Sequence, residues 1–197
     1  LGEVSIAAIG SGDSLKGKVD CEIKSTQGNV NLDAGYSRIS TSSPVKINGN
    51  INSNNINVGN IVQNENFGAV GLDTDVDVLL GKNTRQGNIE GVITHADFKG
   101  YRYNDINVNV SMNNNYYDGS IIITDNNVNL AVAGDAVIEN RIPTFNVQIE
   151  AKDIALDSLN LWNKYPGYRL SASIEAQYSG KTFDTSQALL TVSGLNY

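Results

Sequence analysis

The sequence has few of the residues on which most catalytic and metal sites depend. It contains one cysteine, Cys21, and one histidine, His95, in 197 residues. A single cysteine excludes an internal disulfide, and a single histidine excludes both a multi-histidine metal site and a serine triad with a spare base. We interpret Cys21 as a small apolar side chain of a strand and His95 as an ordinary residue near a strand end. We therefore expect no enzyme activity, no cofactor and no metal site.

Long apolar runs and basic residues are also scarce. No run approaches the ~20 apolar residues that span a bilayer. The formal net charge of −7 disfavours binding to nucleic acid and to an anionic membrane through a polybasic patch. The opening LGEVSIAAIG has neither the basic start nor the cleavage pattern of a signal peptide. Because the chain does not begin with Met, we expect it to be a fragment of a longer protein.

One acidic motif resembles the start of a calcium loop. Asp73, Asp75 and Asp77 alternate with other residues, but an EF-hand loop needs Gly at its sixth position and Glu at its twelfth. Those positions hold Val78 and Thr84. The three aspartates therefore predict the solvated face of a strand.

Asparagine is abundant, with 27 residues, and glycine follows with 19. Both favour turns and disfavour helix interiors. Between the turn signals, apolar and polar residues alternate strictly at 106–110, 128–132, 145–149 and 170–178. This period of two predicts half-buried strands of an antiparallel sheet. Only residues 58–62 and 156–162 look helical, each for about one turn.

A repeat is also visible. The letters NVNL occur at 29–32 and again at 127–130, an interval of 98 residues, and INVGNI at 56–61 aligns with IALDSL at 154–159. The apolar phase is preserved over about 80 residues, although a single slip would turn every side chain to the other face. We expect one elongated β-repeat region over residues 1–197. Its units are 1–98 and an incomplete 99–197, with short one-turn helices between units.

The residues leave two questions open. The apolar face of such a sheet is covered either by a second sheet, as in a sandwich, or by curling of one sheet around a groove. Phe98, Tyr101 and Tyr103 form either a sugar-stacking platform or ordinary packing at the end of the sheet. If the sheet encloses a groove, the groove would hold an apolar ligand such as a lipid. A different class of protein remains as an alternative: a structural or carbohydrate-binding β-repeat, β-helix or adhesin-like, with no lipid role. The short repeat period of a β-helix rung is not visible.

Four stretches follow one another in a distinctive order: KGYRYNDI at 99–106, GSIIITD at 119–125, VNLAVAG at 128–134 and AKDIALDSLNL at 151–161. A closing strand with Gly180 and then Asp184 follows. This order of motifs resembles the TamB/AsmA-like family of Gram-negative bacteria, in particular its Bacteroidetes members. The resemblance covers about residues 47–197. It departs at Asn126, where the family commonly has Pro after Asp.

The resemblance implies an all-β fold, an elongated, curled antiparallel sheet shaped like a gutter or β-taco. It implies a periplasmic location, with the full-length protein anchored in the inner membrane. The implied role is transport of phospholipid between inner and outer membrane and outer-membrane biogenesis. The implied partners are phospholipid or another acyl-chain ligand and, through the full-length protein, a BamA-like outer-membrane barrel. Exposed edge strands also favour self-association of the fragment.

The alternating strands supply candidates for the lining of a lipid groove. All are apolar residues of the predicted inner face: Ile106, Val108, Val110, Ile121, Ile123, Val128, Leu130, Val132, Phe145, Val147 and Ile149. Plain core packing is the alternative role for each of them.

Overall fold

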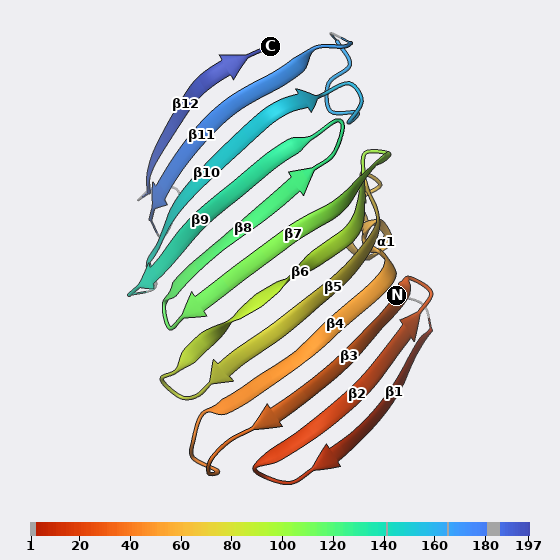
Figure 1. Cartoon of the computed structure of the whole chain (residues 1–197), viewed down its shortest axis with the longest axis vertical. Coiled ribbons are helices and arrows are strands. Elements are labelled where there is room, and N and C mark those ends of the chain that lie inside the picture. The colour runs from red at the N-terminus through yellow and green to blue at the C-terminus, as the bar shows by residue number, and fades with distance from the viewer. Residues whose placement is uncertain (1–2, 141, 165, 181–185) are drawn as a thin grey trace.

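The chain folds into twelve strands and one short helix. The computed structural model describes residues 3–140, 142–164, 166–180 and 186–197. In chain order the elements are β1 (Val4–Gly12), β2 (Lys16–Ser25), β3 (Gly28–Ser37), β4 (Val45–Asn57), α1 (Val58–Val62), β5 (Phe67–Leu80), β6 (Arg85–Phe98), β7 (Tyr101–Asn113), β8 (Tyr116–Thr124), β9 (Asn129–Glu139), β10 (Ile142–Ala155), β11 (Arg169–Ser179) and β12 (Gln187–Asn196). Figure 1 shows the strands side by side in a single layer, with β1 and β12 at opposite ends.

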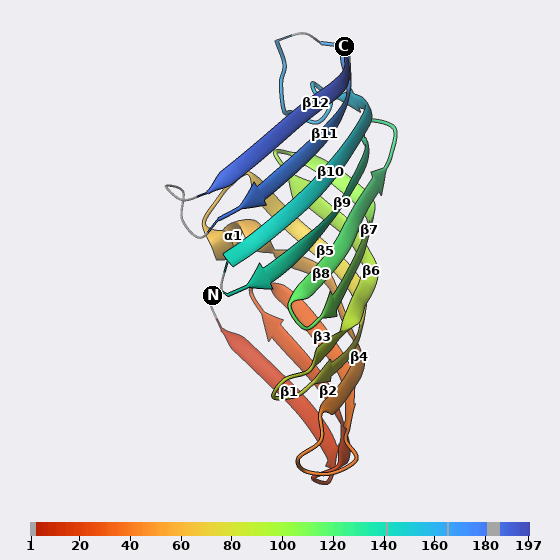
Figure 2. The same cartoon turned by 90° about the vertical axis from the view of Figure 1, so that its left-hand side faces the viewer.

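The twelve strands form one sheet in which each strand pairs with its neighbours in the chain. Every neighbouring pair is antiparallel. Figure 2 shows that the sheet curves and twists along its length. The expected fold, an elongated, curled antiparallel sheet, is confirmed. The described residues contain no second sheet, so they form neither a sandwich nor a parallel β-helix.

The helical segment expected at residues 58–62 is confirmed, but it does not lie between the two expected units. The helix α1 lies between β4 and β5, within the first expected unit, and the segment after β10 forms hydrogen-bonded turns. The two expected units meet instead at a tight turn between β6 and β7. This turn places Lys99 at φ 49° and Gly100 at φ 77°, the left-handed region that two-residue hairpin turns need.

The two halves of the sheet have a repeat-like arrangement of strands. A register shift occurs between Ser53 and Ile56 in β4, and again between Ala151 and Ile154 in β10, 98 residues later. A short non-strand segment follows each shifted strand, α1 in the first half and the turns after β10 in the second. The bulge therefore interrupts regular pairing at the same place in each half.

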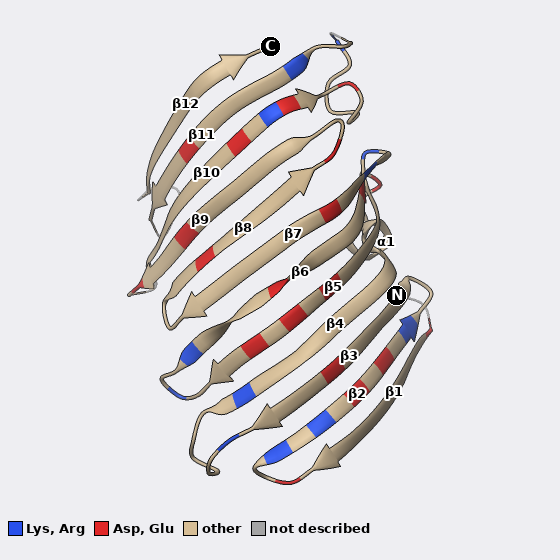
Figure 3. Ribbon diagram, in the orientation of Figure 1, with Lys and Arg blue, Asp and Glu red and all other residues tan. Residues whose placement is uncertain are grey.

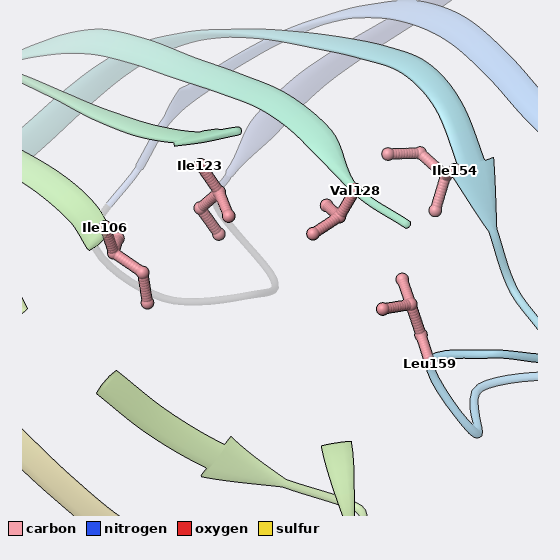
Figure 4. Packing of buried hydrophobic residues seen from close by; sticks show 5 residues of the cluster. All are labelled: Ile106, Ile123, Val128, Ile154 and Leu159. Carbon is pink, nitrogen blue, oxygen red and sulfur yellow. The ribbon is translucent and has the colours of Figure 1, made fainter. Parts of the chain in front are cut away.

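The best-packed part of the molecule lies where the turns after β10 fold back over the sheet. Leu159 is 1% exposed and lies against Ile106, Ile123, Val128 and Ile154. Figure 4 shows these five side chains converging from β7, β8, β10 and the two connecting segments. The cluster is small, so most of the sheet is stabilised by its pairing and by its own side chains rather than by a second layer.

Candidate functional site: the apolar face of the sheet

Alternation along most strands gives the sheet one mainly apolar and one mainly polar face. The strand registers connect residues into rows that run across all the strands. The central row on the apolar face contains Ala8, Cys21, Leu32, Ile51, Thr74, Gly91, Val108, Ile121, Val132, Ile149, Ile174 and Val192, each directly opposite the next. Thr74 is the only polar residue in it. We call the face that carries this row the apolar face.

The positions in this row give the length of the repeat, because each residue of the first half has a counterpart in the second half. The counterpart lies 100 residues later for four of the six strands (Ala8 and Val108, Cys21 and Ile121, Leu32 and Val132, Thr74 and Ile174). The interval is 98 residues for Ile51 and Ile149, and 101 residues for Gly91 and Val192. The NVNL quartets, 98 residues apart, are thus displaced by two residues from the ladder position. Two residues is one full side-chain period, so the displacement leaves every side chain on its expected face.

Two further rows flank one side of the central row. The adjacent row contains many small residues: Gly10, Val19, Ala34, Gly49, Val76, Ile89, Val110, Gly119, Gly134, Val147, Ala176 and Leu190. The next row outward contains four aromatic residues, Tyr36, Tyr117, Phe145 and Tyr178. The rings of Phe145 and Tyr178 lie 5.9 Å apart. The small side chains of the adjacent row therefore leave a shallow depression in the apolar face, and the larger aromatic side chains of the next row lie along one side of it.

A hollow of about 340 Å³ lies on this face over β7–β10. Gly119 and Gly134 are opposite each other and lie among its lining residues, with Ile121 and Val132 on one side and Tyr117 and Phe145 on the other. Sequence reasoning did not select Tyr117. The side-chain period of two nevertheless predicts it, since Tyr117, Gly119 and Ile121 lie on the same face of one strand.

A second hollow of about 490 Å³ lies at the β12 end of the same face. Its apolar lining comes from Leu156, Trp162, Tyr168, Leu170, Leu195 and Tyr197. Arg169 borders it, and its Nη1 donates to Oδ2 of Asp153 at 3.0 Å. None of these residues was a sequence candidate, and only Leu170 lies in a stretch of regular alternation.

The structure places all eleven predicted lining residues together on the apolar face. Three of them, Ile106, Ile123 and Val128, are buried under Leu159, so their contacts are with protein. Three others, Val110, Ile121 and Phe145, are 38%, 41% and 38% exposed. The remaining five are half-buried: Val108, Leu130, Val132, Val147 and Ile149. Side chains in the middle of a twelve-stranded sheet thus remain accessible because no described segment covers them.

The turns after β10 are anchored by a carboxylate. Asp157 accepts hydrogen bonds from the backbone N–H groups of Gly167 and Ser158, each at 2.8 Å. These bonds hold the pKa of Asp157 below its usual range. The Nδ2 atom of Asn160 also donates to the backbone oxygen of Lys99 at 2.9 Å. The segment that covers the buried cluster is therefore tied at both ends.

The aromatic motif of the first hairpin of the second half packs against this cluster. The rings of Tyr101 and Tyr103 meet edge to face, with ring planes at 73° and ring centres 4.8 Å apart, and both adjoin the buried cluster. The hydroxyl of Tyr101 donates to Oδ2 of Asp125 at 2.8 Å. Burial raises the pKa of both tyrosines. The rings do not form a flat platform, which favours the packing interpretation.

The opposite face is polar and explains much of the asparagine content. Asn50 donates through Nδ2 to Oδ1 of Asp73 at 2.7 Å and to Oδ1 of Asp75 at 3.0 Å, and Asn52 donates to Oδ1 of Asn50 at 3.1 Å. Asparagine thus connects strands across this face as well as forming turns. Asp73, Asp75 and Asp77 alternate with Thr74, Val76 and Val78 along β5 and are exposed to solvent, as predicted. Among the described residues, no group of His, Cys, Asp and Glu is arranged to hold a metal ion.

Fold and site together define a class: an open β-sheet repeat protein with one accessible apolar face. Comparisons with protein-family models, with curated proteins and with solved structures found no match. In the part of the chain that the structure describes, no helix has the length and apolar character required to cross a bilayer.

Proposed function

We propose that this chain is a segment of a TamB/AsmA-like protein whose apolar face carries the acyl chains of phospholipids. The observation that supports the proposal is the continuity of the central apolar row, which crosses every strand from β1 to β12 and remains accessible in the middle of the sheet. An apolar surface of this extent, with a polar reverse side, fits a protein that shields hydrocarbon from water.

The dimensions suit an acyl chain that lies across the strands. Eleven spacings of about 4.8 Å make the apolar face roughly 50 Å long. One leaflet of a bilayer is about 15 Å of hydrocarbon, half of the usual core. A chain of that length covers about three strand spacings, which is the width of the hollow over the four strands β7–β10. Several acyl chains therefore fit in succession along the face.

An open face also sets the strength of binding. Burial contributes about 0.8 kcal/mol per methylene when it is complete, and a chain that lies on the face is desolvated on one side only. About ten contacting methylenes then contribute roughly 4 kcal/mol. Such an affinity retains a lipid while allowing it to move, and the head group stays in water.

Location and partners rest on the resemblance alone. We place the chain in the periplasm, with the full-length protein anchored in the inner membrane and a BamA-like barrel as its partner in outer-membrane biogenesis.

The test compares two neighbouring isoleucines of β8. Ile121 lies on the apolar face and is 41% exposed, whereas Ile122 lies on the polar face and is 45% exposed. Ile121→Asp places a charge in the path of the acyl chain, and Ile122→Asp places the same charge outside it. Leu130 is a poorer choice because it packs against the buried cluster.

Native mass spectrometry of the purified chain, followed by lipid identification, is the first measurement, and titration with a dansyl-labelled fatty acid is the second. We expect the wild type to bind lipid at a defined stoichiometry, Ile121→Asp to weaken binding at least tenfold, and Ile122→Asp to leave it unchanged. A folded wild-type chain that binds neither ligand, or an equal loss in both variants, would refute the proposal.

A further inference from the structure

The polar face has a hollow of its own over β7–β10, with a volume of about 520 Å³. Its floor consists of small residues: Ser120 of β8 lies opposite Ala133 of β9, and Gly119 and Gly134 are next to them. The volume falls within the range of roughly 300–1,000 Å³ that is usual for small-molecule sites. All four strands are inner strands of the sheet, paired on both sides within the chain. We call this hollow the polar trough.

Two side-chain amides lie at opposite ends of the polar trough. Asn109 of β7 lies opposite Ser120, and Gln148 of β10 lies opposite Ala133. Three strand spacings therefore separate the two amides, about 14 Å. Both side chains are exposed, and neither makes a side-chain hydrogen bond to another residue that the structure describes. Each amide thus offers an acceptor oxygen and a donor NH₂ group to a ligand.

Two carboxylates border the polar trough on one side. Asp118 of β8 lies directly opposite Asp135 of β9. Asp118 accepts a hydrogen bond from the hydroxyl of Ser111, and Asp135 accepts one from Nδ2 of Asn146 at 3.0 Å. Among the described residues no Lys or Arg lines the trough, and Figure 3 shows acidic but no basic positions on β8 and β9. Like charges directly opposite each other disfavour strand pairing, so a ligand that donates hydrogen bonds to both carboxylates would offset that cost.

An aromatic ring also lines the polar trough. Tyr116 lies two residues before Asp118 on the same face of β8, and it is 42% exposed. A tyrosine ring offers a ligand an apolar surface. In the first half, the strand register gives Lys16 and Lys18 the places of Tyr116 and Asp118. The combination of amides, carboxylates and an aromatic ring is therefore particular to the second half and does not come from the repeat.

This lining selects one class of ligand. The two carboxylates repel anions, and the largely polar lining gives a hydrocarbon chain little surface to contact. A saccharide carries hydroxyl groups that both donate and accept, on rings with apolar C–H faces, and so matches carboxylates, amides and an aromatic ring together.

We propose that the polar trough binds a short, uncharged oligosaccharide. Its hydroxyl groups donate to Asp118 and Asp135, and others exchange hydrogen bonds with the amides of Asn109 and Gln148. One sugar ring lies on Tyr116. The site is on the reverse side of the sheet from the acyl chains, so the two ligands do not compete.

Saturation-transfer NMR on the wild-type chain without lipid is the first test, and isothermal titration then gives the dissociation constants. The uncharged probes are maltohexaose, cellohexaose and chitohexaose, with hexagalacturonate as the anionic comparison and spermine as the cationic one. We expect at least one uncharged probe to bind. The proposal is wrong if none does, or if hexagalacturonate or spermine binds more tightly than all of them. A chain that binds lipid but no saccharide would refute this proposal alone.

Substitutions then locate the site. Gln148→Ala removes an amide of the polar trough, whereas Gln177→Ala removes one from the same face of β11, outside the trough. We expect Gln148→Ala to weaken saccharide binding about fivefold and Tyr116→Ala about tenfold. We expect Tyr116→Phe and Gln177→Ala to stay close to the wild type. Equal losses in Gln148→Ala and Gln177→Ala would overturn the assignment.

Asp118→Asn separates a loss of binding from a loss of folding. The variant removes a ligand-facing charge and also the like-charge pair with Asp135. We expect weaker saccharide binding together with a higher midpoint of urea unfolding, because like charges opposite each other disfavour pairing. Unchanged saccharide binding in Asp118→Asn would contradict the role given to the carboxylates.

Discussion

Replacement of Leu159 by Ala tests whether the turns after β10 hold the packed part of the sheet together. Leu159 is the most buried large side chain described, at 1% exposed. The change removes three carbon atoms, worth about 2.4 kcal/mol of transfer free energy. The cavity left behind adds up to ~2 kcal/mol, and partial collapse beside the open face reduces that addition. We expect the free energy of unfolding to fall by about 2–4 kcal/mol.

The chain offers a matched control for this substitution. Ile61 of α1 corresponds to Leu159 by sequence, since INVGNI at 56–61 aligns with IALDSL at 154–159. Ile61, however, is 45% exposed. Ile61→Ala therefore removes little buried surface, and we expect a loss below about 1 kcal/mol.

Urea unfolding measures both changes with two probes. The single tryptophan, Trp162, lies three residues after Leu159 and reports on the turns, whereas far-ultraviolet circular dichroism reports on the whole sheet. A midpoint lowered in both probes indicates that the cluster supports the sheet, and a shift in fluorescence alone indicates local opening. A loss below about 1 kcal/mol for Leu159→Ala in both probes would refute the assignment of this cluster as the core.

Three further predictions concern polar and backbone features. Asp157 has a lowered pKa, so its contribution to stability is present above its ordinary pKa and is lost as pH falls. Trp162 fluorescence should therefore report loosening of the turns in acid. The Asp157→Asn variant should lack this dependence on pH. Asp105 has φ 51°, a region that β-branched residues avoid, so Asp105→Val should cost about 1–2 kcal/mol in urea unfolding while Asp105→Asn stays near wild type. Tyr101→Phe removes the hydrogen bond to Asp125 and should cost about 1–2 kcal/mol. Because burial raises the pKa of Tyr101, the unfolded chain ionises first, so stability is lost as pH rises through the ordinary tyrosine pKa, less steeply in the Phe variant.

The sequence predicted on which face of the sheet each side chain lies better than it predicted what packs against that face. Alternation around Ile121 and Phe145 was sufficient to place all eleven candidates on one face, because the side-chain period of a strand is fixed by its geometry. The choice between a sandwich and a single curled sheet could not be made from that pattern, since both bury one face of each strand.

Burial within the predicted site was less predictable, for a tertiary reason. Ile61 and Leu159 occupy matching positions in two similar segments, yet one is exposed and the other buried. Likewise Ile123 lies under the turns after β10, whereas Ile121, two residues away, remains accessible. Which part of the apolar face is covered depends on how a connecting segment folds back over it, and local alternation carries no information on that.

The succession of strands also determines how the molecule responds to mechanical load. The chain enters the sheet at β1 and leaves it at β12, at opposite ends of the sheet (Figure 1). A force applied through these two strands pulls across the strands rather than along them, so it loads the hydrogen bonds of one strand pair at a time. Such a sheet yields by peeling strand by strand from its edges, at low force and in small steps. If the chain spans a gap between two surfaces, it can lengthen by releasing an outer strand and shorten again by re-forming that strand, while the remainder of the apolar face stays intact.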